Sequence, residues 1–243
     1  MVKAVFFDLY HTLVRYDPPR EELQARALKD HGIYIAPEIL RRPLIVADEF
    51  MYRELASSPL SQRSTKDKMA LYARYQGIVL EEAGVEASEQ LILGLLAEMR
   101  QSDMKLVLFD DVLPALTDLK DRGLILGLIS NVDRDMTPLL DELGLTSLLQ
   151  VVVTSQDTGF SKPQPEIFRE AIRRAGVQAS EAIFVGDQYE IDIIGARNAG
   201  MSGVLLDRGG LFDKTTDCPR IRTLTQVGHL VLDDGSAWSR GGV

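Results

Sequence analysis

The sequence has few of the features that mark secreted, membrane-spanning or nucleic-acid-binding proteins. It contains a single cysteine, Cys218, so no disulfide can form within the chain, as is usual in reducing compartments. No apolar run is long enough to span a membrane, and an apolar strand follows Met1 where a secreted protein would have a signal peptide. We therefore expect a cytoplasmic protein with no membrane partner.

Basic residues are also in the minority. Lysine and arginine total 27, against 36 aspartates and glutamates, and the formal net charge is −9. Binding to a phosphate backbone needs clustered basic side chains, so this balance argues against nucleic acid as a partner. It still allows a local pocket for a small anion. With 243 residues, the chain can form one large domain or two smaller ones.

The sequence does contain alternating apolar strands and amphipathic helices. Residues 2–7 are nearly all apolar, as in a strand covered on both faces of a parallel sheet, and Asp8 follows where that strand meets solvent. Helical patterns then alternate with four short apolar runs, residues 124–129, 151–153, 182–185 and 204–206. This alternation predicts a doubly wound, Rossmann-like α/β core with a parallel sheet and right-handed connections.

The stretch between these strands, residues 15–102, has a helical pattern instead. It reads as about four amphipathic helices, and Pro43 is expected to kink the second helix or delay its start. We therefore expect a helical cap over residues 15–102, inserted into a catalytic core formed by residues 1–14 and 103–243. The last stretch, residues 234–243, is rich in glycine and serine and is expected to fray.

Polar residues follow the predicted strands at what should be one edge of the sheet. In open α/β sheets the reactive crevice lies at the carboxyl ends of the strands. A single polar strand end can be a turn or a helix cap, but four of them at the same edge describe a site. They are Asp8, the pair Ser130-Asn131, the loop containing Lys162, and Asp187 with Asp192.

The order and spacing of these residues resemble the haloacid dehalogenase superfamily of hydrolases. The resemblance covers the whole chain outside the helical insertion, which lies between the first and second motifs, where the family has its helical cap. Each motif alone is a weak signal, whereas the four together are specific. The matching stretches are Asp8-x-x-x-Thr12, Ser130-Asn131, Lys162-Pro163-x-Pro165 and Gly186-Asp187-x-x-x-x-Asp192.

The resemblance implies a catalytic role for four of these residues. Asp8 would be the nucleophile and would form a covalent intermediate on its carboxylate. Thr12 would anchor the following turn and orient Asp8, although a threonine there can also be a plain helix cap. Ser130 would hydrogen-bond the transferred group. Lys162 would neutralise the negative charge of Asp8 and of the substrate together.

The resemblance also implies a Mg²⁺ site. Asp8, Asp187 and Asp192 would hold the ion, directly or through water, together with the backbone carbonyl of Tyr10. Hard oxygen ligands in small number suit Mg²⁺. Asp192 has a simpler interpretation as an acidic residue at a helix start, where the helix dipole favours negative charge.

Two positions depart from the phosphatases of this family. Most of them have a second aspartate two residues after the nucleophile, which protonates the leaving alcohol, and a glycine after it. Here these positions are Tyr10 and His11. A tyrosine resembles the 2-haloacid dehalogenases, in which halide leaves as an anion and needs no proton. His11 could supply the missing proton or be merely structural.

Two enzymatic interpretations therefore compete, a Mg²⁺-dependent phosphatase without the usual acid and a metal-free 2-haloacid dehalogenase. Asp187 favours the phosphatase, because two neighbouring carboxylates without a cation share a proton, which weakens the nucleophile. The resemblance agrees, since dehalogenases have serine and asparagine in this region. A third interpretation, a binding or regulatory module on a hydrolase scaffold, is disfavoured because all six motif residues are present.

We predict a hydrolase of small phosphorylated metabolites or other small anionic substrates, with Mg²⁺ as cofactor. Arg41 or Arg42 in the cap could bind a substrate carboxylate or phosphate, although arginines on helices more often lie on a solvated face. The residues expected to contact substrate are Tyr10, His11, Asn131, Arg41 and Arg42.

Overall fold

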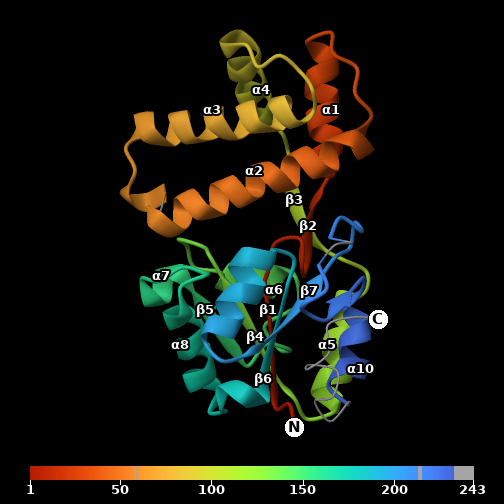
Figure 1. Cartoon of the computed structure of the whole chain (residues 1–243), viewed down its shortest axis with the longest axis vertical. Coiled ribbons are helices and arrows are strands. Elements are labelled where there is room, and N and C mark those ends of the chain that lie inside the picture. Colours follow the sequence, from red (N-terminus) through yellow and green to blue (C-terminus); the bar gives the residue numbers. More distant parts are fainter. Residues whose placement is uncertain (59, 213–214, 233–243) are drawn as a thin grey trace. The chain divides into compact units, whose positions relative to one another are not determined.

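The computed structural model describes residues 1–58, 60–212 and 215–232, and the chain divides into two compact units (Figure 1). One unit comprises Met1–Arg15 with Leu108–Val243, and the other comprises Tyr16–Val107. The sequence placed these boundaries after residues 14 and 102. The expected fraying of residues 234–243 concerns a segment outside the described residues. None of the helices in the described part of the chain could cross a membrane.

A parallel sheet of six described strands forms the centre of the first unit, which confirms the predicted fold class. β1 lies inside the sheet, with Phe7 opposite Leu128 of β4 on one side and Val185 of β6 on the other. All four residues of β1 are buried, which explains its continuous apolar sequence. In sheet order the strands are β5 (Val151–Thr154), β4 (Ile125–Ser130), β1 (Ala4–Phe7), β6 (Ala182–Gly186), β7 (Ser202–Leu206) and β8 (Arg220–Ile221).

Helices follow the strands and cover the sheet. α8 buries Ile167 and Phe168 against Phe6 and Phe184 of the sheet, and the rings of Phe168 and Phe184 meet edge to face at 5.2 Å. α5 packs beside α10 elsewhere in this unit (Figure 1). The helices are α5 (Val112–Asp121), α6 (Thr137–Glu142), α7 (Ser155–Thr158), α8 (Pro165–Ala175), α9 (Gly195–Asn198) and α10 (Val227–Leu230).

One helix of this unit differs from its sequence pattern. The apolar spacing of residues 191–199 is that of one continuous helix, but a π-helical turn, Tyr189–Ile194, precedes the short helix α9. The turn buries Asp192, whose carboxylate accepts the Gln188 N–H at 3.0 Å. Such turns are frequent at functional sites, and the spacing of apolar residues does not reveal them.

In the described residues, the second unit contains four α-helices with a core of their own. Leu28, Leu40, Leu80 and Leu95 form this core. The expected delay at Pro43 is wrong, because α2 begins at Pro37, whose fixed φ suits a first helical turn, and runs through Pro43. The helices are α1 (Arg20–Asp30), α2 (Pro37–Ser57), α3 (Thr65–Glu82) and α4 (Glu89–Gln101). Two unexpected short strands, β2 (Val14–Asp17) and β3 (Lys105–Leu108), pair with each other where the chain passes between the units.

Candidate active site

Asp8 follows β1 at the carboxyl edge of the sheet, where the backbone holds it. Its N–H donates to the carbonyl oxygen of Val185 at 2.9 Å, and the residue is only 7% exposed. The chain then turns sharply, and the N–H of Leu13 donates to the carbonyl oxygen of Leu9. Within this turn His11 has φ +60°, a left-handed conformation that glycine adopts without steric cost. A glycine would therefore fit this position at least as well as His11.

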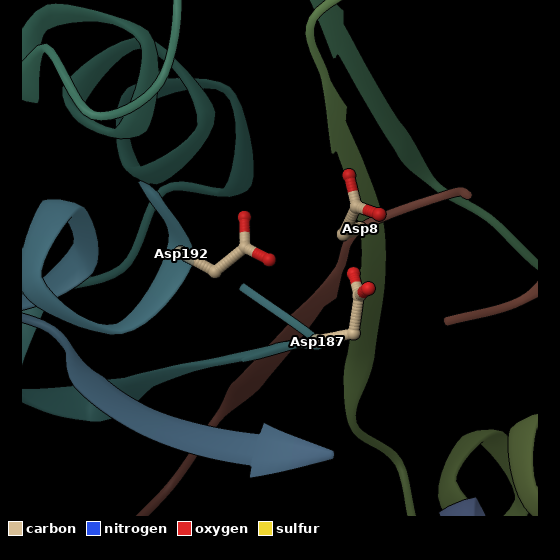
Figure 2. Close-up of side chains that lie close together, drawn as sticks. All are labelled: Asp8, Asp187 and Asp192. Carbon is tan, nitrogen blue, oxygen red and sulfur yellow. The ribbon is translucent and has the colours of Figure 1, made fainter. Parts of the chain in front are cut away.

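Three carboxylates meet at this edge (Figure 2). Asp187 follows β6, Asp192 lies in the π-helical turn, and one oxygen from each of Asp8, Asp187 and Asp192 lies within 4.8 Å of the other two. Asp8 and Asp192 are buried, so their negative charges are poorly screened by solvent. A hard divalent cation bound by these oxygens would relieve the repulsion. The backbone carbonyl of Tyr10 stays a predicted ligand.

Gly186, the last residue of β6, leaves the space that Asp192 occupies. A Cβ at position 186 would lie 2.2 Å from Asp192 Oδ2. The same oxygen accepts the Gln188 N–H, so a hydrogen bond fixes the carboxylate where a larger residue would collide with it. The glycine of this motif is therefore required by the close approach of a side chain and not by an unusual φ.

Replacing Gly186 by alanine should displace Asp192 and weaken Mg²⁺ binding by about 10–100-fold, the usual cost of disturbing the support of a metal ligand. Titration calorimetry with Mg²⁺ measures this change. Gly209→Ala is the matched control, because among the described residues a Cβ at Gly209 would meet Leu211 at an ordinary 3.4 Å. Equal Mg²⁺ affinity in wild type and Gly186→Ala would show that Asp192 is not a ligand.

Lys162 bridges the nucleophile and the acidic cluster. Its Nζ donates to Asp8 Oδ1 at 2.6 Å and to Asp192 Oδ1 at 2.7 Å, and the residue is 2% exposed. Burial raises the pKa of Asp8 to about 6, with attraction from Lys162 opposing the rise and repulsion from Asp192 adding to it. Burial disfavours the Lys162 ammonium, but attraction by Asp192 and Asp8 outweighs this and raises its pKa. Lys162 is therefore a permanent positive charge beside the nucleophile.

Asn131 fixes the backbone of Lys162. Its Oδ1 accepts the Lys162 N–H at 2.7 Å, and its Nδ2 donates to the Lys162 carbonyl oxygen at 2.9 Å. The sequence assigned Asn131 to substrate binding and did not indicate this clamp between two loops far apart in the chain. Contact of Asn131 with substrate stays a prediction.

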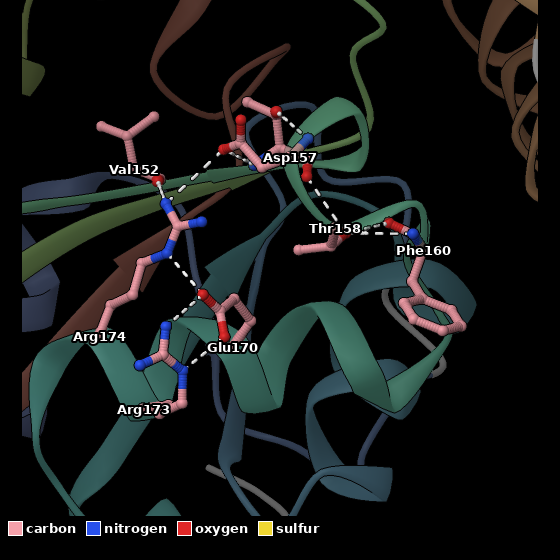
Figure 3. Close-up of polar contacts among 8 residues, drawn as sticks. Val152, Asp157, Thr158, Phe160, Glu170, Arg173 and Arg174 are labelled. Atoms are coloured by element: carbon pink, nitrogen blue, oxygen red, sulfur yellow. Dashed lines mark hydrogen bonds and ion pairs between the residues drawn. The ribbon is translucent and has the colours of Figure 1, made fainter.

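The segment before Lys162 is also anchored by polar contacts (Figure 3). Asp157 closes a capping box at the start of α7, and Thr158 Oγ1 accepts the Phe160 N–H at 3.1 Å. Arg174 of α8 donates to the carbonyl oxygen of Val152 in β5 at 2.7 Å. These bonds tie β5, α7 and α8 together around the loop that presents Lys162.

In the described part of the chain, two buried hydroxyl groups of the motifs, those of Ser130 and Thr12, lack the hydrogen bonds that buried hydroxyls usually make. Neither Ser130 Oγ nor Thr12 Oγ1 has a hydrogen-bond partner within the described residues, although buried hydroxyls are usually bonded. Ser130 ends β4, the strand next to β1, and its hydroxyl is suited to a ligand. The side-chain anchor expected of Thr12 is not seen. Its backbone carbonyl instead accepts a bond from Arg208 at 2.9 Å.

Arg208, after β7, is a residue that the sequence did not single out. Its guanidinium makes two bonds of 2.9 Å to the carboxylate of Asp111 and lies 3.9 Å from the centre of the Phe109 ring. Burial would raise the pKa of Asp111, but the bonds from Arg208 and from the Leu224 N–H outweigh it and lower the pKa. Through Thr12, Arg208 thus joins the turn after Asp8 to the segment that follows β3. A lone arginine after a strand gives no signal in one sequence.

Tyr10 also has a partner that the sequence did not indicate. Arg134, in the loop after β4, donates to the Tyr10 hydroxyl at 3.5 Å. The two arginines assigned to substrate binding lie on α2 in the other unit, where Arg41 pairs with Glu21 at 3.1 Å and Arg42 is exposed. Substrate contacts of Tyr10, Arg41 and Arg42 stay predictions.

Comparison with known proteins gives a family and several relatives. The family model of haloacid dehalogenase-like hydrolases matches residues 2–200. A glyceraldehyde 3-phosphate phosphatase of Methanopyrus kandleri is 32% identical, over 86% of this chain and 85% of the relative. A phosphoserine phosphatase of Thermus thermophilus is 35% identical, over 86% and 90%. The crystal structure of a 2-haloacid dehalogenase from Pseudomonas syringae is 30% identical, with a TM-score of 0.54 and coverage of 96% and 99%.

Proposed function

Because the chain belongs to the haloacid dehalogenase-like hydrolases, we propose that it is a Mg²⁺-dependent phosphatase of small phosphorylated metabolites that transfers the phosphoryl group to Asp8. The observation that carries the proposal is the cluster of Asp8, Asp187 and Asp192. Lys162 supplies one positive charge to these three carboxylates, so a further cation is needed to balance them, and phosphoryl transfer makes use of one. Relatives named as phosphatases at 32% and 35% identity support the same reaction.

Each residue of the site then has a chemical task. The Asp8 carboxylate attacks the phosphorus atom, the bond from phosphorus to the leaving oxygen breaks, and an aspartyl phosphate forms. The leaving oxygen takes up a proton from solvent and departs as the alcohol. The Lys162 ammonium, 2.6 Å from Asp8, stabilises the negative charge on the transferred group. The Ser130 hydroxyl donates a hydrogen bond to a phosphoryl oxygen. Water then attacks phosphorus, which releases phosphate and restores the Asp8 carboxylate.

The acidic cluster fits the proposed cofactor. Asp8, Asp187 and Asp192 would hold Mg²⁺, which would supply positive charge to the phosphoryl oxygens. The absence of a Cβ at Gly186 is consistent with this assignment, because a Cβ there would collide with the Asp192 carboxylate.

A 2-haloacid dehalogenase is the second candidate. Two observations favour it, the tyrosine at position 10 and the similarity to the Pseudomonas syringae dehalogenase. In that reaction Asp8 would attack the carbon that carries the halogen, and no proton donor is needed for the halide. Asp187 and Asp192 argue against it, because an anionic acid would have to enter beside two carboxylates in addition to the nucleophile.

Metal dependence tests the proposed function. Phosphate release from an activated aryl phosphate should stop in EDTA and return with Mg²⁺. Because burial raises the pKa of Asp8 to about 6, Asp8 takes up a proton as the pH falls through that value, and Mg²⁺ must displace it. The Mg²⁺ concentration for half-maximal activity should rise by up to about tenfold per pH unit below this pKa. Halide release from 2-chloropropionate in EDTA, without phosphate release in Mg²⁺, would establish the dehalogenase instead.

The double substitution Tyr10→Asp with His11→Gly should raise kcat/KM for an alkyl phosphate by up to about 10²-fold, the low end for general acid catalysis. The leaving alkoxide needs a proton that Asp at position 10 can donate, and glycine suits the left-handed φ of His11. An activated aryl phosphate, whose leaving phenolate needs no proton, should change much less. Equal changes for both substrates would show that Tyr10 does not face the leaving group.

A further inference from the structure

Arg134 is an exposed arginine that lies between Asp133 and Asp135 in the sequence and forms no ion pair within the part of the chain that the structure describes. Its side chain is exposed, and its contact is with the Tyr10 hydroxyl, a neutral group, at 3.5 Å. No carboxylate within residues 1–58, 60–212 and 215–232 forms an ion pair with it, even though acidic residues outnumber basic ones in this chain. By contrast, Lys162 and Arg208, two cations of the same unit, are bonded to carboxylates at 2.6–2.9 Å.

The position of Arg134 separates it from the groups that handle the transferred phosphoryl. Lys162 donates to both Asp8 and Asp192, whereas the hydrogen bond of Arg134 goes to Tyr10. It is attached to the site through Tyr10, on the turn two residues beyond the nucleophile. Arg134 is therefore outside the hydrogen-bonded set formed by Asp8, Lys162 and Asp192.

The guanidinium determines which ligands fit. Its planar set of N–H donors matches the oxygens of a carboxylate or a phosphate in pairs, and it has no acceptor for an alcohol proton. Since the contact with Tyr10 uses one nitrogen, Nη2, at the long end of hydrogen-bond distances, the remaining donors can bind a ligand without breaking a strong bond.

We propose that Arg134 binds a second anionic group, a carboxylate or a phosphate, on the part of the substrate that leaves. The preferred substrates are then phosphate monoesters that carry another anion. This inference rests on the proposed phosphatase function and narrows its substrate class.

Three substrates of the same carbon skeleton test the proposal. Glycerol 3-phosphate has a neutral hydroxyl at the far end, 3-phosphoglycerate has a carboxylate there, and glycerol 1,3-bisphosphate has a second phosphate. In wild type, kcat/KM should be higher for 3-phosphoglycerate, for glycerol 1,3-bisphosphate or for both than for glycerol 3-phosphate. In Arg134→Gln, the ratio of kcat/KM for that substrate to kcat/KM for glycerol 3-phosphate should fall by about 10–100-fold, as expected for charge-assisted hydrogen bonds. The substrate whose ratio falls more identifies carboxylate or phosphate as the bound group.

Arg169→Gln is the matched control, because Arg169 is an exposed arginine of α8, 3.8 Å from Glu166, and its loss changes the net charge equally. Its ratios should equal those of wild type. Unchanged ratios in Arg134→Gln, or an equal loss for all three substrates, would overturn the role of Arg134 while the phosphatase function stands. If wild type hydrolysed none of the three substrates and no aryl phosphate either, the phosphatase function would be overturned, and this inference with it.

Discussion

Asp8→Asn should reduce phosphate release by at least about 10⁴-fold, because the neutral amide is a poor nucleophile and loss of a reacting group typically costs this much or more. The fold should survive the change. Asparagine has nearly the same shape, the backbone bond from Asp8 to Val185 remains, and Lys162 keeps Asp192 as a partner. Burial already disfavours the charged form of Asp8, as its pKa of about 6 indicates, so removing the charge should cost little stability.

Steady-state assays of Asp8→Asn should therefore be paired with thermal unfolding. The expected result is a midpoint close to that of wild type with activity near background. Asp187→Asn is a useful companion, since it removes a cluster carboxylate without touching the proposed nucleophile. Its loss of activity should be partly recovered by higher Mg²⁺, whereas that of Asp8→Asn should not. Turnover by Asp8→Asn within tenfold of wild type would assign the nucleophile to another residue.

Lys162→Met should lower kcat by about 10²–10³-fold, the usual cost of losing one preorganised charge or donor aimed at the transition state. It should also destabilise the protein. Removing one partner of a buried ion pair typically costs about 3–5 kcal/mol, because the other charge is left uncompensated. Here two carboxylates, Asp8 and Asp192, lose the same ammonium.

The pH dependence of Lys162→Met follows from the same contacts. Without the attraction of Lys162, the pKa of Asp8 should rise above about 6. A carboxyl group whose pKa is raised by folding favours the folded state when protonated, so in metal-free buffer the destabilisation should be smaller at low pH and larger at high pH. Lys120→Met is the control, since Lys120 is exposed and its ammonium donates to a neutral group, the Ser147 carbonyl oxygen. If Lys162→Met and Lys120→Met had equal unfolding free energies at pH values below and above 6, the bonds from Lys162 to Asp8 and Asp192 would be contradicted.

The sequence predicted the core of the fold because the signals were local. The apolar residues before Asp8 identify a buried central strand, and parallel pairing then brings the ends of neighbouring strands to one edge. Ser130 and Asp187 follow such strands, and this alone places them near Asp8. Spacing and resemblance together were sufficient to name the acidic cluster that the structure contains.

The remaining features depend on contacts between residues far apart in the chain. The clamp of Asn131 on Lys162 and the bond from Arg208 to Thr12 join separate loops, and no pattern within one segment encodes them. The collision that requires Gly186 arises from a π-helical turn, which the apolar spacing around Asp192 does not distinguish from an α-helix. Such contacts become visible only when the folded chain places the loops together.

The most direct test of the account is the chemical identity of the group that Asp8 carries during turnover. Enzyme in excess over an activated aryl phosphate, whose leaving group needs no proton donor, should be quenched in acid within a single turnover in the presence of Mg²⁺, and its peptides should be analysed by mass spectrometry. We predict one phosphoryl group on the peptide that contains Asp8, absent in EDTA and absent in Asp8→Asn. An Asp8 peptide that never carries phosphate, or one that becomes esterified by a 2-haloacid without Mg²⁺, would contradict the phosphatase mechanism.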